Sequence, residues 1–214
     1  MITMSYKDDA FELLAGNVIK NLEKRNTEGY YFKDSKSCVD AILAMMPKKS
    51  KISWGGSMTM EECGLMDALK ENDYELIDRL QAKNEQESRE LFAKSVLSDY
   101  FFMSTNAMTY DGELVNIDGK GNRVACLIQG PEHVFIVVGR NKLTATLDSA
   151  VERVRNVASP ANAIRLKRNL PCGLTGRCHD CLSPDCFCNQ VVVTRRNGQA
   201  GRIKVFLINE DLGY

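Results

Sequence analysis

Between residues 29 and 103 the sequence alternates short strand-like runs with amphipathic helical runs, and this alternation restricts the fold more than any other feature. Runs rich in aromatic and β-branched residues cover residues 30–32, 51–54, 75–78 and 99–103. Between them, apolar side chains recur at helical spacing over residues 37–46, 58–69 and 84–96. Strands that alternate with helices of this length predict a three-layer α/β/α domain with a mostly parallel sheet.

The flanking segments fit one domain over residues 1–214. Ser5 with Asp8 predicts a capping box at the start of an N-terminal helix, and Ser37 with Asp40 predicts another further along. Pro160, directly after Ser159, favours the start of a separate helix there. The expected organisation is an N-terminal helix (5–28), an α/β core (29–170), a Cys-rich insert that forms a loop or short helix (171–190) and terminal strands (191–214).

Charge and hydropathy exclude several classes of protein. Lys and Arg number 28 and Asp and Glu number 28, and this zero net charge argues against a dedicated nucleic-acid binder. The longest apolar runs, residues 41–46 and 134–138, are far shorter than the ~20 residues that span a bilayer. No apolar run follows a basic start, so we expect a cytoplasmic protein without a signal peptide or membrane span.

A glycine pair at the end of the strand 51–54 is the first candidate for ligand binding. Gly55 and Gly56 let a ligand approach the backbone closely, while Ser57 and Thr59 add hydroxyl donors at a helix start. Free amides at a helix start attract phosphate or carboxylate, and ligands in open α/β sheets bind beyond the strand ends. The alternative is a tight turn with an ordinary helix cap.

The second candidate is a polar stretch, residues 104–123, which begins at the next strand end and contains one short strand at 114–117. Asp111-Gly112 and Asp118-Gly119 could simply be turns. Two turns do not account for the other polar residues, so we expect a ligand site here, with Arg123 as a fork for an anionic group. The stretch contributes Thr105, Asn106, Asn116, Gly119, Asn122 and Arg123 to the predicted site.

Five of the eight cysteines fall between residues 172 and 188. Cys178 and Cys181 have the spacing of half a zinc or iron–sulfur site, and Cys186 and Cys188 supply two further thiols. Cys172 could replace one of them. In a reducing compartment such a cluster indicates metal or redox chemistry. Packed reduced thiols and a reversible disulfide remain the alternatives to zinc or an iron–sulfur cluster.

Four stretches, taken in order, resemble the LUD (lactate-utilisation) domain family. They are residues 54–59 (WGGSMT), 114–123 (LVNIDGKGNR), 134–142 (VFIVVGRNK) and 175–184 (TGRCHDCLSP). The resemblance covers roughly residues 5–214 and implies a cytosolic bacterial or archaeal protein. It also implies a fold similar to the sugar-phosphate isomerase and coenzyme A transferase superfamily. Related proteins act beside iron–sulfur subunits in the oxidation of L-lactate to pyruvate.

The superfamily resemblance also suggests where a catalytic carboxylate would lie. In the isomerases that position would fall near Asn106, whose amide cannot serve as a general base. Asp111 and Asp118 remain the candidate carboxylates. No stretch resembles the glutamate nucleophile of the transferases.

Three functions from different classes therefore stay open. The family favours a subunit or accessory protein in oxidation of lactate or a related 2-hydroxy acid, beside an iron–sulfur oxidase subunit. The fold and the glycine loop favour a sugar-phosphate isomerase-like or acyl-transferase-like enzyme. Asn106 and the missing acid–base pair favour a non-catalytic metabolite-binding module. In each case the expected ligand is a small anion or phosphometabolite, and the chain could form a homo-oligomer.

Overall fold

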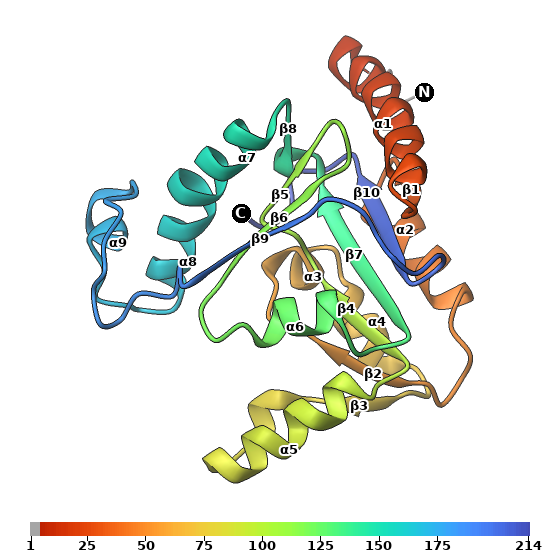
Figure 1. The fold of residues 1–214 in the computed structure, drawn as a ribbon. Coiled ribbons are helices and arrows are strands. Elements are labelled where there is room, and N and C mark those ends of the chain that lie inside the picture. The colour runs from red at the N-terminus through yellow and green to blue at the C-terminus, as the bar shows by residue number, and fades with distance from the viewer. Residues whose placement is uncertain (1–4) are drawn as a thin grey trace.

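The computed structural model describes residues 5–214, and its centre is a six-stranded sheet in which every neighbouring pair is parallel. Figure 1 shows this sheet with helices on both faces. The strand order is β1 (Glu28–Phe32), β10 (Ile203–Ile208), β7 (His133–Gly139), β4 (Tyr100–Met103), β2 (Lys51–Trp54) and β3 (Glu75–Ile77). The predicted three-layer α/β class is confirmed.

Alternate residues of the central strands point to opposite faces, and this period of two divides the core into two layers. Phe135 and Val137 of β7 pack in one layer, whereas Val134, Ile136 and Val138 pack in the other. The first layer is covered by α2 (Ser35–Ala44), α3 (Met58–Glu62) and α4 (Leu65–Glu71). The second is covered by α1 (Tyr6–Lys24), α5 (Glu85–Val96) and α6 (Asn122–Ile128).

A second, four-stranded sheet crosses the carboxyl edge of the first, and the sequence did not predict it. Its order is β8 (Leu143–Thr144), β5 (Ala107–Thr109), β6 (Leu114–Asp118) and β9 (Gln190–Thr194), with β6 antiparallel to β5 and β9. The polar stretch after β4 is therefore a β-hairpin rather than a loop with one strand. The last two strands belong to different sheets, since β9 pairs with β6 and β10 with β1 and β7.

Of three predictions about helix ends and helix length, one is confirmed and two are wrong. The Ser5–Asp8 capping box is present, but Asp34 and not Ser37 caps α2. The expected helix over 58–69 breaks at Gly64, whose φ of 78° is the left-handed conformation that glycine tolerates best. These differences change the local path of the chain and leave the layers intact.

The helices predicted on either side of Pro160 run into one another. α7 (Leu147–Arg153) continues through a π-helical segment (Val154–Ala158) into α8 (Ser159–Arg165), and Ala158 itself has helical angles. Proline has no N–H to donate, and a π segment is one way in which a helix accommodates an irregular hydrogen-bond ladder. The Cys-rich segment then begins with α9 (Pro171–Thr175) and returns as an irregular chain to β9.

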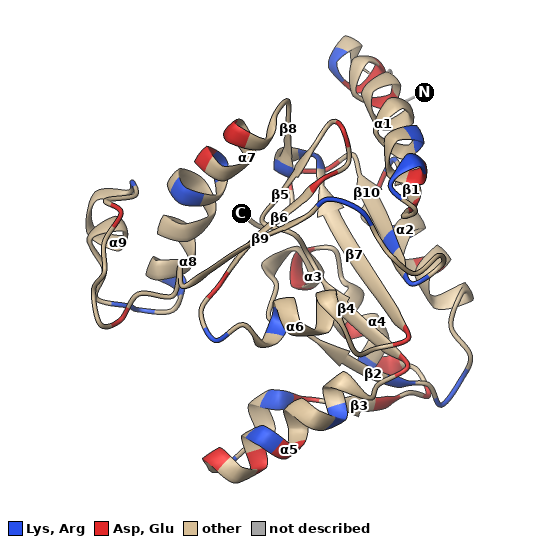
Figure 2. Ribbon diagram, in the orientation of Figure 1, with Lys and Arg blue, Asp and Glu red and all other residues tan. Residues whose placement is uncertain are grey.

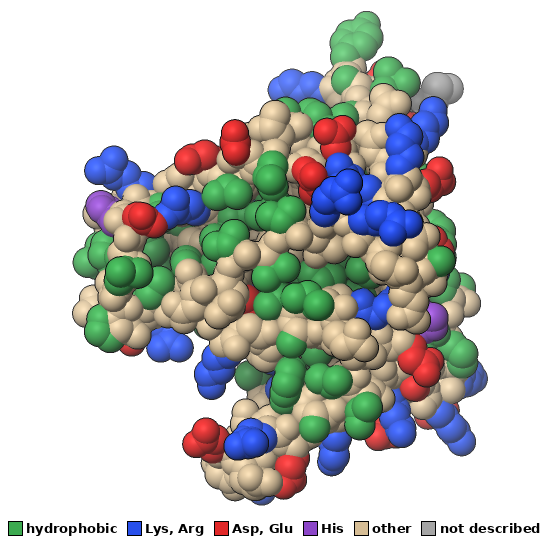
Figure 3. Space-filling view, viewed as in Figure 1, with side chains coloured by type: hydrophobic (Ala, Val, Ile, Leu, Met, Phe, Trp, Pro, Cys, Tyr) green, Lys and Arg blue, Asp and Glu red, His purple; other side chains and the backbone are tan. Residues whose placement is uncertain are grey.

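The surface mixes both signs of charge. Blue and red segments are interspersed along the helices in Figure 2. Figure 3 shows hydrophobic side chains gathered across the middle of the same face. The exposed hydrophobic residues include Val191 and Val193 of β9. None of the helices within residues 5–214 is both long and apolar enough to cross a bilayer.

Candidate functional site

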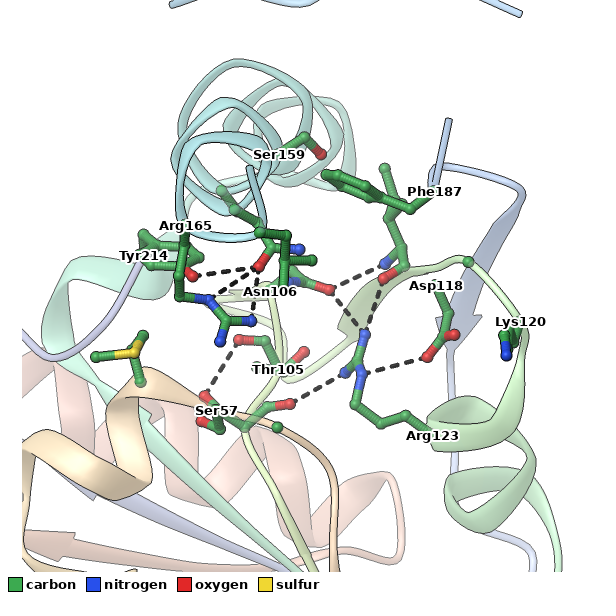
Figure 4. A pocket seen from close by; sticks show the side chains of 18 of the residues that line it. Ser57, Thr105, Asn106, Asp118, Lys120, Arg123, Ser159, Arg165, Phe187 and Tyr214 are labelled. Atoms are coloured by element: carbon green, nitrogen blue, oxygen red, sulfur yellow. Dashed lines mark hydrogen bonds and ion pairs between the residues drawn. The ribbon is translucent and has the colours of Figure 1, made fainter. Parts of the chain in front are cut away.

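A cavity of about 280 Å³ lies where the carboxyl ends of β2, β4 and β6 face α8 and the Cys-rich segment. The glycine loop contributes Gly56 and Ser57, and the β4–β5 connection contributes Thr105 and Asn106. Figure 4 shows Arg123 on one side of this space, Arg165 and Tyr214 on the other, and Ser159 and Phe187 beside it. The cavity thus joins segments that are far apart in the sequence.

Seven of the ten residues predicted for the ligand site line this cavity. They are Gly56, Ser57, Thr105, Asn106, Gly119, Asn122 and Arg123. The other three, Gly55, Thr59 and Asn116, lie behind its wall. A Cβ on Gly55 would stand 2.8 Å from Arg123 Cδ, so this glycine gives the arginine stem room rather than a ligand. Thr59 and Asn116 are fully buried.

The Arg123 guanidinium is committed to the protein. Its Nη1 donates to the Ser104 carbonyl (3.2 Å) and to Asn116 Oδ1 (2.6 Å). Its Nη2 donates to Asn106 Oδ1 (3.0 Å) and to the Ile117 carbonyl (2.9 Å). Its Nε lies 3.3 Å from Asp118 Oδ2, and burial lowers the arginine pKa while the carboxylate raises it. Every guanidinium nitrogen therefore has a protein acceptor, and Arg123 organises the wall instead of offering a fork to a ligand.

The two candidate carboxylates are in different situations. Asp118 lines the cavity, but it pairs with Arg123 and accepts the Gly121 N–H at 2.9 Å. Asp111 is exposed at the β5–β6 turn, away from the cavity. Asp118 is thus the single carboxylate among the described lining residues, and no pair of carboxylates for acid–base catalysis forms there.

Lys142 is among the lining residues that were not predicted from the sequence. It ends the short 3-10 helix (Arg140–Lys142) that follows β7, and it is only 3% exposed. Its Nζ donates to Thr59 Oγ1 (2.7 Å) and Ser104 Oγ (3.0 Å). Its pKa is lowered to about 7, first by burial and then by the neighbouring cations Arg153 and Arg123, against a smaller opposing effect of Glu62. The available signal was a lysine at the carboxyl end of the most apolar strand, next to the other predicted strand ends.

Positive charge exceeds negative charge around the cavity. Besides the Asp118–Arg123 pair and Lys142, the lining holds Lys120, Arg165 and Arg168. Arg165 is exposed and donates to Asn162 Oδ1 through Nε (3.3 Å) and Nη2 (2.9 Å). Arg168 has one distant carboxylate partner, Asp185, at 3.9 Å. Several of these cations therefore have N–H donors that remain free to bind an anionic ligand.

Two buried polar atoms at the site have no partner within the described residues. The Ser57 hydroxyl belongs to a lining residue, and the Asn116 Nδ2 lies just behind Arg123. Unpaired buried polar groups are costly, so native structures usually supply a protein, water or ligand partner. Ser57 Oγ is thus a buried hydroxyl on a lining residue that has no partner among the described residues.

The cysteines do not assemble the predicted metal site. Within residues 5–214 no three His, Cys, Asp or Glu side chains are grouped so that they could hold a metal ion. Cys172 is buried against Ala163 and Leu170, and Cys188 Sγ points to Ser159 Oγ at 3.5 Å. Cys178 and Cys186 instead accept backbone N–H groups of their own loop, from Asp180 (3.3 Å) and Cys188 (3.4 Å). As they lie, these thiols do not fit zinc or an iron–sulfur cluster.

The family follows from comparison with known proteins. The model of the LUD domain matches residues 16–208, so this chain belongs to the LUD domain family. The membership confirms the resemblance in the sequence, and at family level it makes the chain a lactate-utilisation-related protein.

One solved structure supports the fold alone. A DUF162 family protein from Deinococcus radiodurans is 12% identical and superposes with a TM-score of 0.51, over 94% of this chain and 98% of that one. The delta subunit of eIF2B from Chaetomium thermophilum is 12% identical with a TM-score of 0.36, over 71% of this chain and 60% of that one. No curated protein sequence matches this chain.

Proposed function

We propose that this chain is a subunit or accessory protein in the oxidation of lactate or a related 2-hydroxy acid, and that its cavity binds a small anionic metabolite. The main support is the excess of cations around the cavity. Among the described lining residues only Asp118 has a carboxylate, and it is already paired with Arg123. The unpartnered Ser57 hydroxyl adds a donor for a carboxylate or phosphate oxygen. The LUD family membership supplies the metabolic context.

The geometry gives less support to the two other functions. Asn106 accepts the Ile117 N–H (3.0 Å) and Arg123 Nη2 through the same oxygen, so its side chain holds the wall together. With Asp118 paired, an isomerase would lack a free carboxylate base at this position. A non-catalytic binding module remains compatible with the same cavity and differs from our proposal only in the absence of turnover.

Partners and compartment are part of the proposal. An iron–sulfur oxidase subunit would receive the electrons that leave a 2-hydroxy acid, and a homo-oligomer and a cytoplasmic location fit the same role. A gene neighbourhood that encodes such a subunit would support this assignment, and co-purification of that subunit with the tagged chain would test it directly.

Ligand binding is tested by thermal shift. The parent chain is screened with L-lactate, pyruvate, phosphate and sugar phosphates, beside Gly56→Val and Gly198→Val. A Cβ at either glycine has no other atom within 4 Å, but only Gly56 lines the cavity. We expect a ligand-induced rise in melting temperature for the parent and Gly198→Val, and its loss in Gly56→Val. If the parent responds to none of these anions, the binding proposal is rejected.

A further inference from the structure

The hydrogen bonds around Lys142 occupy two of the positions around its amine nitrogen. Thr59 Oγ1 donates its own proton to the Leu212 carbonyl (3.2 Å), and Ser104 Oγ donates to the Thr105 carbonyl (3.3 Å). Both hydroxyls can therefore only accept from Lys142 Nζ, which uses two N–H groups for them. Within residues 5–214 no third acceptor for Nζ is found, although an ammonium group carries three protons.

The charged neighbours agree with a neutral amine. The groups that act on Lys142 are the cations Arg153 and Arg123 and the carboxylate of Glu62. Glu62 accepts the Gly213 N–H at 2.6 Å and forms no ion pair with Lys142. A lysine that is buried beside other cations loses its proton easily and becomes a nucleophile at neutral pH. The third position of Nζ is then a lone pair on a residue that lines the cavity.

We propose that the Lys142 amine forms an imine with the carbonyl carbon of a 2-oxo acid bound in the cavity. This inference rests on the proposed function, because a 2-oxo acid is the product of oxidising a 2-hydroxy acid. The Nζ lone pair attacks the carbonyl carbon, and a proton moves from nitrogen to the carbonyl oxygen. Water then leaves as the C=N bond forms, so the step is balanced without an oxidant or reductant.

The cavity supplies groups for the other end of such a ligand. Ser57 Oγ is an unpartnered donor, and Arg165 and Arg168 add positive charge to the lining. Together they would bind the carboxylate, while Thr59 and Ser104 hold the amine in place. A simple anion such as phosphate would use the same cations but has no carbonyl for Lys142. The inference therefore separates 2-oxo acids from other anions by their chemistry.

Reductive trapping tests the inference. The full chain is incubated at pH 7 with pyruvate and sodium cyanoborohydride, and labelled lysines are mapped by peptide mass spectrometry. Reduction of the imine adds the mass of pyruvic acid less one oxygen atom. We expect Lys142 to be labelled at least ~10-fold more than the exposed lysines, since lysines of ordinary pKa are almost fully protonated at this pH. Lys142→Met should abolish this label, whereas Lys94→Met on the exposed face of α5 should retain it.

Mapping in the parent chain makes the test independent of whether Lys142→Met folds. Oxamate, a pyruvate analogue whose amide carbonyl does not form imines, is used in parallel by thermal shift. If oxamate or lactate stabilises the parent but Lys142 is not labelled by pyruvate, the imine inference is wrong and the binding proposal stands. If no anion stabilises the chain and Lys142 is not labelled, both are wrong.

Discussion

The two walls of the cavity are held together in different ways. On one side Arg123 binds four acceptors and an ion-pair partner, and the side chains of Arg123 and Asp118 are only 14% and 8% exposed. On the other side, the Cys-rich segment buries Cys172 against Ala163 of α8 and the preceding Leu170, but leaves Leu182 99% exposed. A segment with few buried apolar contacts opens at lower free energy than a buried, fully paired network. The Arg123 wall is thus pre-organised, and the Cys-rich wall is the weaker one.

Removal of the Arg123 side chain should have the largest effect. Arg123→Met would leave a buried carboxylate at Asp118 and several carbonyl and amide oxygens without their donor. Breaking a buried pair in this way costs about 3–5 kcal/mol of unfolding free energy. Urea unfolding of both proteins measures the difference. Arg165→Met is the matched control, because this exposed arginine should change stability by less than about 0.5 kcal/mol. Equal stability of Arg123→Met and the parent would contradict the proposed role of this wall.

The same contrast shows what the sequence could and could not predict. The alternation of strands and helices predicted the layers, because each element's periodicity records which face it buries. The convergence of Gly56 and Thr105 followed from the rule that ligands bind beyond the carboxyl ends of parallel strands, whereas Asn122 comes there after β6 of the small sheet. The role of Arg123 could not be predicted, since its acceptors include the carbonyls of Ser104 and Ile117, which any residue would provide.

Other differences arise from pairing at long range. The small sheet depends on β9 lying beside β6, which is more than 70 residues away in the sequence. The periodicity of each strand carries no record of that partner. The predicted thiol site stays a prediction: the spacing places the cysteines in one loop, but within residues 5–214 no three candidate ligands are grouped so that they could hold a metal ion.

The second largest effect should appear as a pH dependence of stability. Lys142 has a folded-state pKa of about 7 and an unfolded value near ~10.4, so the unfolded chain binds one more proton between these values. Stability due to this group therefore rises with pH across that window, by up to about 1.4 kcal/mol per unit. Below pH 7 and above pH 10.4 its contribution should be flat.

Lys142→Met isolates this contribution, because the methionine has similar length and no titrating group. Between pH 8 and pH 10 the unfolding free energy of the parent should gain about 2–3 kcal/mol relative to that of the variant. Denaturant titrations at several pH values provide the measurement. Parallel pH profiles for the two proteins would show that Lys142 remains an ammonium group in the folded chain.

The neighbouring glycines offer a smaller and sharper test of the Arg123 wall. A Cβ on Gly55 would lie 2.8 Å from Arg123 Cδ and 3.0 Å from its Cγ, whereas a Cβ on Gly56 meets nothing within 4 Å. The arginine cannot shift without losing its hydrogen bonds, so Gly55→Ala should cost about 1–3 kcal/mol as overpacking does. Gly56→Ala should cost less than about 0.5 kcal/mol. Thermal unfolding compares the two, and equal effects would show that the Arg123 wall yields easily.

The smallest effect is expected at the Cys-rich wall, in Cys181→Ser. Cys181 is partly exposed and belongs to the small cluster around Cys172, and hydrogen bonds from Ser183 lower the pKa of its thiol. If its sulfur only packs there, the substitution should change the unfolding free energy by less than about 0.5 kcal/mol.

A metal held by this thiol would make the loss of stability much larger, because a structural metal binds only the folded chain and its binding free energy adds to the free energy of unfolding. Zinc and iron analysis of protein purified without oxygen separates the two cases. We expect less than about one-tenth of an equivalent of either metal per chain, because a structural zinc site needs four convergent ligands and no such group forms within residues 5–214. A full equivalent of metal, together with a large loss of stability in Cys181→Ser, would mean that the Cys-rich wall becomes ordered around an ion and is as rigid as the Arg123 wall.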